Sequence, residues 1–121
     1  NGLVGLTTVR LKISNIYSPE KSIEDDFLVD SGASITVIPA EMVRKLKLKP
    51  IYEKEFLLAD GKVVKRKIGN ALIRFKDIEI PTQVVLGGKN DSKLLGALTL
   101  EGMGLALDPF ERRLYKARLT L

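Results

Sequence analysis

The chain has 121 residues, 45% of them hydrophobic and 29% charged, and 20 basic against 15 acidic residues give a formal net charge of +5. This length and composition predict one compact domain with its own hydrophobic core. Because the sequence contains no histidine and no cysteine, it excludes imidazole bases, thiolate nucleophiles, disulfides and zinc sites built on those ligands. Any catalysis must therefore use carboxylates, hydroxyls, amines or a hard metal ion bound to oxygen.

The N-terminal part of the chain reads as strands separated by a polar loop. Hydrophobic and polar residues alternate from Thr7 onward, so residues 3–14 predict a long strand with one buried face. Residues 15–25 are polar and predict a surface loop. Residues 27–29 predict a short apolar strand that ends abruptly at Asp30.

A short helix and a hairpin are predicted next. Residues 35–38 form another apolar strand, and Pro39 suits the first position of a helix that continues to Leu46. The pair Asp60-Gly61 lies between two extended runs and predicts a tight hairpin, whose type I′ turn needs positive φ at both residues. The two runs of this hairpin cover residues 52–59 and 62–68.

The C-terminal half adds further strands and a second short helix. The predicted strands cover residues 71–75, 78–86, 94–96, 103–107 and 114–121. A helical turn is predicted over residues 97–101, and Asp108-Pro109 predicts a turn. Many short strands with one or two short helices indicate a mainly β domain, a partly closed barrel.

Asp30 is the first candidate for chemistry. It follows three apolar residues, and Ser31 and Gly32 allow the chain to turn sharply directly after it. A carboxylate in this place would be held rigidly and partly desolvated, with backbone N–H groups of the turn nearby. The alternative is a strand-ending turn with a solvated carboxylate, and the three residues taken alone favour that alternative.

A wider arrangement of segments favours a catalytic role. Residues 27–38, which read FLVDSGASITVI, resemble the active-site segment of retropepsin-like aspartic peptidases, in which apolar residues, Asp, Thr or Ser, Gly and Ala precede a strand. The hairpin at residues 57–63 resembles the flap of that family, and residues 94–98 resemble its second marker, two apolar residues and a glycine before a short helix. The three segments occur in the family's order, and the resemblance as a whole extends over residues 27–107.

The resemblance implies a fold and an activity. The fold would be one half of the closed acid-protease β-barrel, built from residues 1–121 as a single domain with one half-site per chain. Asp30 would be the catalytic residue of an aspartic endopeptidase, and the second carboxylate would be Asp30 of another copy in a C2 homodimer. Two carboxyls about 3 Å apart cannot both ionise, so they would share one proton and activate water without a cofactor or a metal ion. The partner molecule would be a polypeptide bound in an extended conformation.

The resemblance also implies roles for the remaining site residues. In the active-site loop, Ser31 would hydrogen-bond across the dimer, and Gly32 would leave its carbonyl facing the substrate backbone. The implied flap tip consists of Ala59, Asp60 and Gly61. The implied walls of apolar side-chain pockets are Leu28, Ala33, Ile35, Val37 and Leu94. Gly96 would be the structural glycine of the second marker, and the alternative for each pocket residue is an ordinary place in the core.

Two positions depart from the viral members of that family. Viral retropepsins commonly carry an acidic residue where this chain has Ser34 and an arginine where it has Ala97, and those two residues form an ion pair near the dimer interface. Because both are replaced together, no buried charge is left unpaired. Residues 3–11 or 114–121 are expected to supply the interface strands here.

Other partners and locations are weighed on composition. The basic residues are scattered, and the chain has four phenylalanines, three tyrosines and no tryptophan, so it offers few aromatic rings for base stacking and no nucleic-acid partner is expected. The alternatives are a non-catalytic peptide-binding or dimerisation module on the same fold, and a small basic β-barrel that binds nucleic acid. No apolar run approaches the roughly 18 residues of a membrane span, the N-terminus does not resemble a signal peptide, and the expected location is the cytoplasm. Asp25 and Asp26 are expected in a solvated loop rather than in a metal site, and Asp91 is expected in a turn.

Overall fold

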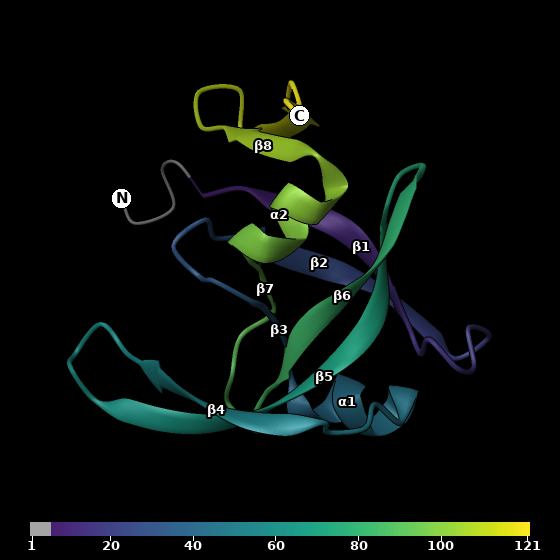
Figure 1. Cartoon of the computed structure of the whole chain (residues 1–121), viewed down its shortest axis with the longest axis vertical. Helices are drawn as coiled ribbons and strands as arrows, with labels where there is room; N and C mark the ends of the chain where they lie inside the picture. The colour runs from purple at the N-terminus through teal and green to yellow at the C-terminus, as the bar shows by residue number, and fades with distance from the viewer. Residues whose placement is uncertain (1–5) are drawn as a thin grey trace.

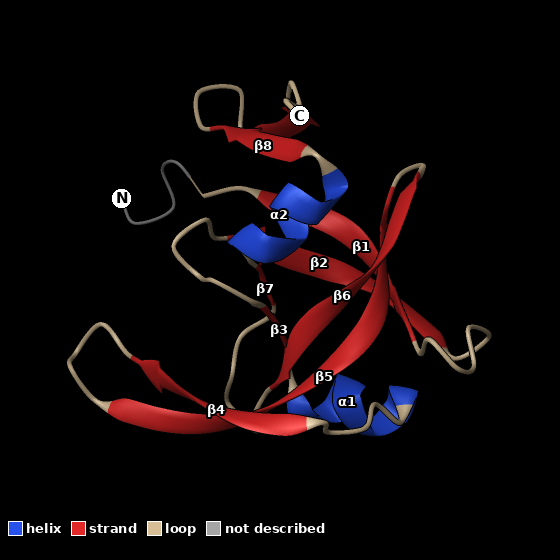
Figure 2. Ribbon diagram, in the orientation of Figure 1, coloured by secondary structure: helices blue, strands red, loops and turns tan. Residues whose placement is uncertain are grey.

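The structure, a computed structural model, describes residues 6–121 and is mainly β. Figures 1 and 2 show a curved sheet with one short helix at its lower edge and a second above its centre. The described elements are β1 (Thr8–Ser14), β2 (Ser22–Val29), β3 (Thr36–Ile38), α1 (Ala40–Leu46), β4 (Tyr52–Leu57), β5 (Val63–Phe75), β6 (Ile78–Leu86), β7 (Leu94–Leu95), α2 (Ala97–Met103), β8 (Leu105–Asp108) and β9 (Arg113–Lys116).

The main sheet has the strand order β1-β2-β7-β3-β6-β5-β4, and β8 pairs with β9 in a separate two-stranded sheet. Because β1 also pairs with β5, the main sheet folds back on itself as the predicted partly closed barrel. The short strand β7 runs parallel to β2 and antiparallel to β3. It therefore brings the end of β2, the start of β3 and the start of α2 together.

One large hydrophobic cluster fills the interior, and a smaller one lies beside it. The large cluster includes the fully buried side chains of Leu11, Ile13, Phe27, Ile38 and Leu95. The smaller cluster consists of Ile35, Ile68 and Val85, with Val37 and Phe56 packed against it. This second cluster lies at the base of the β4–β5 hairpin, so the hairpin is joined to the body of the molecule by apolar contacts.

The prediction of a loop over residues 15–25 is wrong at its C-terminal end, because β2 begins at Ser22. The first half of this strand is acidic and lacks the apolar alternation that predicts strands. It pairs with β1 in a register that places Glu24 opposite Lys12 and Asp26 opposite Arg10. Cross-strand pairs of opposite charge stabilise a sheet, so a polar segment becomes a strand through its partner.

The two strands predicted over residues 62–68 and 71–75 form one continuous 13-residue strand, β5. Its first half pairs with β4, and its second half pairs with β6 and β1. Gly69 lies near the exchange of partners, and a Cβ atom there would lie 2.7 Å from the carbonyl oxygen of Lys49. Gly69 therefore permits a close backbone approach within one continuous strand.

The hairpin between β4 and β5 is present, but the predicted type I′ turn is wrong. The Gly61 N–H donates to the Leu58 carbonyl, the Leu58 N–H donates to the Lys62 carbonyl, and Gly61 has a φ of +87°. Asp60 is not among the residues with positive φ. This is a three-residue connection, a type I turn followed by a left-handed glycine. The Lys62 N–H donates to Asp60 Oδ1, which stabilises the turn.

Several predicted boundaries shift at the chain ends. The predicted strand over residues 3–14 is observed from Thr8 to Ser14, and its residues 3–5 lie outside the described residues. The predicted strand over 103–107 is wrong at its start, because α2 continues to Met103 and β8 begins at Leu105. The predicted terminal strand over 114–121 is observed only as β9, which ends at Lys116.

The helices are short. Pro39, predicted as the first helical residue, is the N-cap of α1. Within residues 6–121, neither helix is long and apolar enough to cross a membrane.

Candidate active site

Asp30 lies directly after β2, in a turn that is hydrogen-bonded to neighbouring segments. Its backbone N–H donates to the Leu95 carbonyl at 3.0 Å, and its own carbonyl accepts the Ala33 N–H at 3.1 Å. Its side-chain Oδ1 accepts the Gly32 N–H at 2.9 Å. The backbone on both sides therefore fixes the direction of this half-buried carboxylate.

The turn that carries Asp30 is held to the start of α2 through backbone contacts. The Ala97 N–H donates to the Ala33 carbonyl at 2.8 Å, and the Leu98 N–H donates to the Ser34 carbonyl at 3.0 Å. A Cβ atom on Gly96 would lie 2.6 Å from the carbonyl carbon of Ile35. The second marker therefore packs directly on the segment that follows Asp30.

Two buried threonines that no sequence pattern predicts support the same junction. The hydroxyls of Thr36 and Thr99 lie 2.6 Å apart, and Thr36 Oγ1 accepts the Gly96 N–H at 3.0 Å. Both side chains are fully buried, where a hydroxyl without a partner would be costly. Thr36 lies on β3 and Thr99 in α2, 63 residues apart in sequence, so nothing local in the sequence marks this pair.

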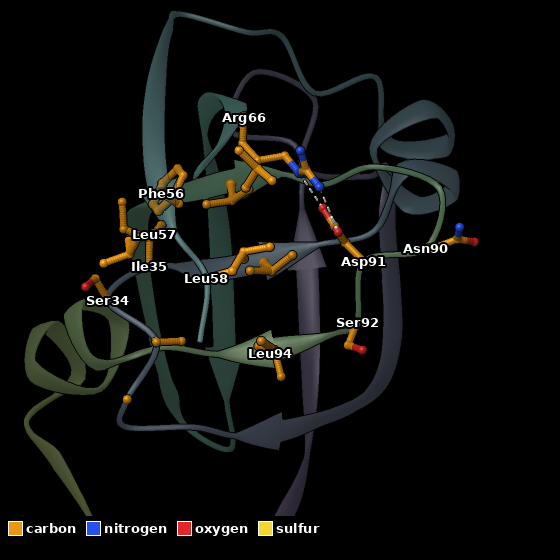
Figure 3. A pocket seen from close by; sticks show the side chains of 15 residues that line it. Ser34, Ile35, Phe56, Leu57, Leu58, Arg66, Asn90, Asp91, Ser92 and Leu94 are labelled. Carbon is orange, nitrogen blue, oxygen red and sulfur yellow. Dashed lines mark hydrogen bonds and ion pairs between the residues drawn. The ribbon is translucent and has the colours of Figure 1, made fainter. Parts of the chain in front are cut away.

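A cavity of about 400 Å³ lies beside the Asp30 turn, between the β4–β5 hairpin and the loop that precedes β7. Figure 3 shows side chains entering it from all three segments. The lining residues are Gly32, Ala33, Ser34, Ile35, Val37, Phe56, Leu57, Leu58, Val64, Arg66, Val85, Asn90, Asp91, Ser92 and Leu94. Most of them are apolar, so the cavity suits a hydrophobic group with a few polar contacts.

The predicted site residues are distributed unevenly around this cavity. Of the predicted pocket residues, four line it: Ala33, Ile35, Val37 and Leu94. Leu28 is half-buried on β2 and does not line the cavity. Asp30 and Ser31, in the turn after β2, do not line it either.

The predicted flap residues lie at the exposed tip of the β4–β5 hairpin. Ala59, Asp60 and Gly61 are solvent-exposed and do not line the cavity. Their neighbours Leu57 and Leu58 do line it, and the Leu57 side chain remains 75% exposed. The hairpin thus presents apolar side chains over the cavity without closing it.

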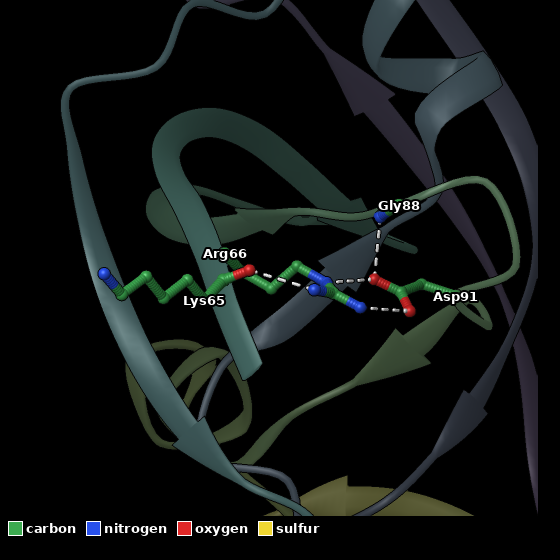
Figure 4. A network of polar contacts seen from close by, with 4 residues as sticks. All are labelled: Lys65, Arg66, Gly88 and Asp91. Atoms are coloured by element: carbon green, nitrogen blue, oxygen red, sulfur yellow. Dashed lines mark hydrogen bonds and ion pairs between the residues drawn. The ribbon is translucent and has the colours of Figure 1, made fainter. Parts of the chain in front are cut away.

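An ion pair that no sequence pattern predicts crosses one wall of the cavity. Arg66 Nε donates to Asp91 Oδ2 at 2.7 Å, and Arg66 Nη2 donates to Asp91 Oδ1 at 3.2 Å (Figure 4). Asp91 Oδ2 also accepts the Gly88 N–H at 2.7 Å, and Arg66 Nη1 donates to the Lys65 carbonyl. Asp91 is the predicted turn residue, and its partner lies 25 residues away in sequence.

The pair shifts both ionisation equilibria. The hydrogen bond from the Arg66 guanidinium lowers the pKa of the Asp91 carboxyl below its ordinary value of 3.8, and partial burial opposes this shift. The same hydrogen bond raises the pKa of Arg66. Their side chains are 30% and 26% exposed, so the pair is largely shielded from water.

Replacing Asp91 with asparagine is expected to make stability less dependent on pH. The pKa of Asp91 is lower in the folded state, so its contribution is complete above about pH 4 and is lost as the pH falls through the folded-state pKa. We expect Asp91→Asn to lower the free energy of unfolding by about 1–2 kcal/mol at pH 7, and the difference to shrink toward pH 2. Urea unfolding at equal protein concentration measures both values. The control is Asp77→Asn, at an exposed turn between β5 and β6; an equal pH dependence in the two variants would contradict the assignment.

Three other acidic residues have structural partners, namely Asp25, Asp26 and Asp108. Asp25 and Asp26 lie on β2 rather than in the expected loop, and they form ion pairs with Lys93 at 2.9 Å and Arg10 at 3.4 Å. The hydrogen bond from Lys93 lowers the pKa of Asp25. Asp108 accepts two backbone N–H groups and is the predicted turn residue. Among residues 6–121 no group of three or more acidic side chains lies close enough to hold a metal ion.

Comparison with known proteins identifies related sequences and folds. Residues 22–101 match the family described as "gag-polyprotein putative aspartyl protease". The structure resembles that of EIAV protease in complex with the inhibitor HBY-793, with a TM-score of 0.58 and 19% identity over 94% of this chain and 91% of that chain. It also resembles the retroviral protease-like domain of Ddi1 from Leishmania major, with a TM-score of 0.56 and 12% identity over 93% and 90%.

A third similar structure is that of simian foamy virus (mac) protease, with a TM-score of 0.52 and 16% identity over 76% of this chain and 91% of that chain. At these identities the structural likenesses establish the fold. No curated protein matches the sequence.

Proposed function

The chain belongs to the gag-polyprotein aspartyl protease family, and on this premise we propose that it is an aspartic endopeptidase that acts as a homodimer. Residues 1–121 form one domain that carries one half of the active site. Asp30 is the catalytic residue. The observation that carries the proposal is the carboxylate of Asp30, which the Gly32 N–H orients at the end of β2, beside an apolar cavity under a hairpin.

The proposed dimer follows from the number of carboxylates that the reaction needs. Peptide hydrolysis by two acids requires one carboxylate that accepts a proton and one carboxylic acid that donates one. The sequence contains a single Asp-Ser-Gly segment, so a twofold axis beside Asp30 supplies the second acid from another copy. Two identical carboxyls about 3 Å apart hold one proton between them, because they cannot both carry a negative charge.

The chemistry then needs no group beyond the two carboxyls and a water molecule. The ionised carboxylate takes a proton from the water molecule while the water oxygen forms a bond to the scissile carbonyl carbon. The protonated carboxyl donates its proton to the carbonyl oxygen, which gives a tetrahedral diol. Proton transfer to the leaving nitrogen and cleavage of the C–N bond yield the two peptide products and restore the shared proton.

The surrounding residues position the peptide in this proposal. Ser31 hydrogen-bonds between the two Asp30 turns. Ala59, Asp60 and Gly61 form the tip of a flap that closes over the bound peptide and excludes water. The cavity takes one substrate side chain against Ala33, Ile35, Val37 and Leu94, which favours large side chains with apolar surface.

Activity is expected to depend on dimerisation. Sedimentation velocity should show a dimer, and cleavage of unfolded casein at mildly acidic pH should be inhibited by pepstatin. When the chain is diluted below its dimer dissociation constant, the rate should fall with about the square of chain concentration, because only the dimer holds both carboxyls. A monomer with undiminished activity per chain would contradict the shared site, and a dimer that binds peptides without cleaving them would contradict the enzymatic proposal.

A further inference from the structure

The Arg66–Asp91 pair gives the mainly apolar cavity one charged wall, with Asn90 and Ser92 on either side of Asp91. Arg66 lies on β5, in the hairpin, and Asp91 lies in the loop that precedes β7, so the pair joins two segments that flank the cavity. In Figure 3 the pair lies across the cavity from Ser34, which belongs to the Asp30 turn. A side chain that fills the cavity from the turn side therefore reaches the ion pair at the far wall.

Arg66 and Asp91 retain donors and acceptors that their own hydrogen bonds do not use. A guanidinium has five N–H donors. In Arg66, two of them bind Asp91 and one binds the Lys65 carbonyl. Asp91 Oδ1 accepts only the Arg66 Nη2 donor among the described contacts. The wall can therefore offer both a donor and an acceptor to a group in the cavity.

The pair carries no net charge, and this determines which groups it accepts. A carboxylate near the wall is attracted by Arg66 but repelled by Asp91, and an ammonium group experiences the reverse. Neither gains enough to offset the loss of its hydration in a partly enclosed cavity. An uncharged hydroxyl or amide can bond to the remaining donor and acceptor, and a purely apolar tip leaves those groups without partners.

We infer that the Arg66–Asp91 pair is a specificity determinant, which selects substrate side chains with an apolar stem and an uncharged hydrogen-bonding tip, such as tyrosine or glutamine. It selects against glutamate and lysine of similar length. The inference rests on the proposed function in that a peptide side chain occupies the cavity. Sites built to hydrogen-bond a substrate group reject analogues that lack it, so tyrosine should be favoured over phenylalanine by about tenfold or more in kcat/KM.

Peptides that differ at one position next to the scissile bond test this inference. Tyrosine, phenylalanine, glutamine, glutamate and lysine are placed in turn on either side of the bond. Arg66→Gln leaves the charge of Asp91 unpaired and should shift the lysine-to-glutamine ratio of kcat/KM at least tenfold toward lysine. Asp91→Asn leaves Arg66 unpaired and keeps an oxygen for the Gly88 N–H, and it should shift the glutamate-to-glutamine ratio toward glutamate by a similar factor.

Two further variants act as controls. The double variant Arg66→Gln/Asp91→Asn removes both charges and should again discriminate against lysine and glutamate. Arg74→Gln removes an arginine from the same strand, where it pairs at the surface with Glu79, and it should leave the wild-type profile unchanged. An unchanged profile in both single variants, or the same change in the Arg74 variant, would overturn the inference.

Binding measured without catalysis separates this inference from the proposed function. The affinities of the same labelled peptides for the Asp30→Asn chain, and for that chain carrying each cavity variant, are measured by fluorescence anisotropy. Opposite charge preferences in the two single variants support the inference even if the wild type cleaves nothing, in which case the enzymatic proposal alone fails. Cleavage with no change of preference overturns the inference alone. A folded protein that binds none of the peptides contradicts both.

Discussion

Replacing Asp30 with asparagine is expected to lower peptide hydrolysis by about 10⁴-fold or more, because the residue supplies both acids of the proposed dyad. In a homodimer a single substitution removes two carboxyls at once. Asparagine has almost the same shape, and its side-chain oxygen can still accept the Gly32 N–H. The fold and the dimer should therefore remain, while no group is left that can take a proton from water.

Cleavage of unfolded casein at mildly acidic pH, combined with sedimentation and circular dichroism, measures this effect. The matched control is Asp26→Asn on β2, the strand that leads to Asp30, which removes an exposed carboxylate whose partner Arg10 is also exposed. The activity of this variant should stay within about twofold of wild type. If Asp30→Asn retained a tenth of the wild-type activity, the assignment of Asp30 as the catalytic residue would be wrong.

Mixing the two chains tests the shared site directly. A dimer of one wild-type and one Asp30→Asn chain holds a single carboxyl and should be inactive. Added variant chain should therefore suppress the activity of a fixed amount of wild type as mixed dimers form. Activity that does not respond to the added variant would contradict a dyad assembled from two copies.

Replacing Gly96 with alanine is expected to destabilise the fold by about 3 kcal/mol or more, or to prevent folding. The new Cβ atom would lie 2.6 Å from the carbonyl carbon of Ile35 and 2.9 Å from the Thr36 nitrogen. These are backbone atoms, so no rotation of a side chain relieves the overlap. Moving them would break the contacts of the Ala97 and Gly96 N–H groups that hold the Asp30 turn against α2.

Urea or thermal unfolding at equal protein concentration measures this loss. Gly88→Ala is the matched control, because a Cβ atom there meets its nearest neighbour, Asp91 Oδ2, at 3.6 Å, an ordinary contact distance. Its free energy of unfolding should stay within about 1 kcal/mol of wild type. If Gly96→Ala were equally mild, the close packing of the second marker against the Asp30 turn would not be required for folding.

The sequence by itself determined the features that depend on neighbouring residues. The apolar run before Asp30 and the Ser-Gly after it predict a strand that ends in a turn, and the structure has Asp30 in that position. The strand preference of the apolar run and the conformational freedom of glycine are properties of adjacent residues, so the sequence alone reveals them. The Asp-Gly pair predicted a hairpin for the same reason. The resemblance to aspartic peptidases, carried by three short segments, led to the family that the comparison identifies.

The tertiary structure alone decided the features that depend on contacts between distant residues. The acidic first half of β2 became a strand because β1 supplies opposite charges in register. The pairing of Arg66 with Asp91 and the pairing of Thr36 with Thr99 join residues 25 and 63 positions apart. Periodicity and turn propensity describe only the energies of neighbouring residues, whereas these pairs are stabilised by removal from water in one particular arrangement of the chain. That arrangement determines which charges face the cavity, and it forms only when the sheet closes.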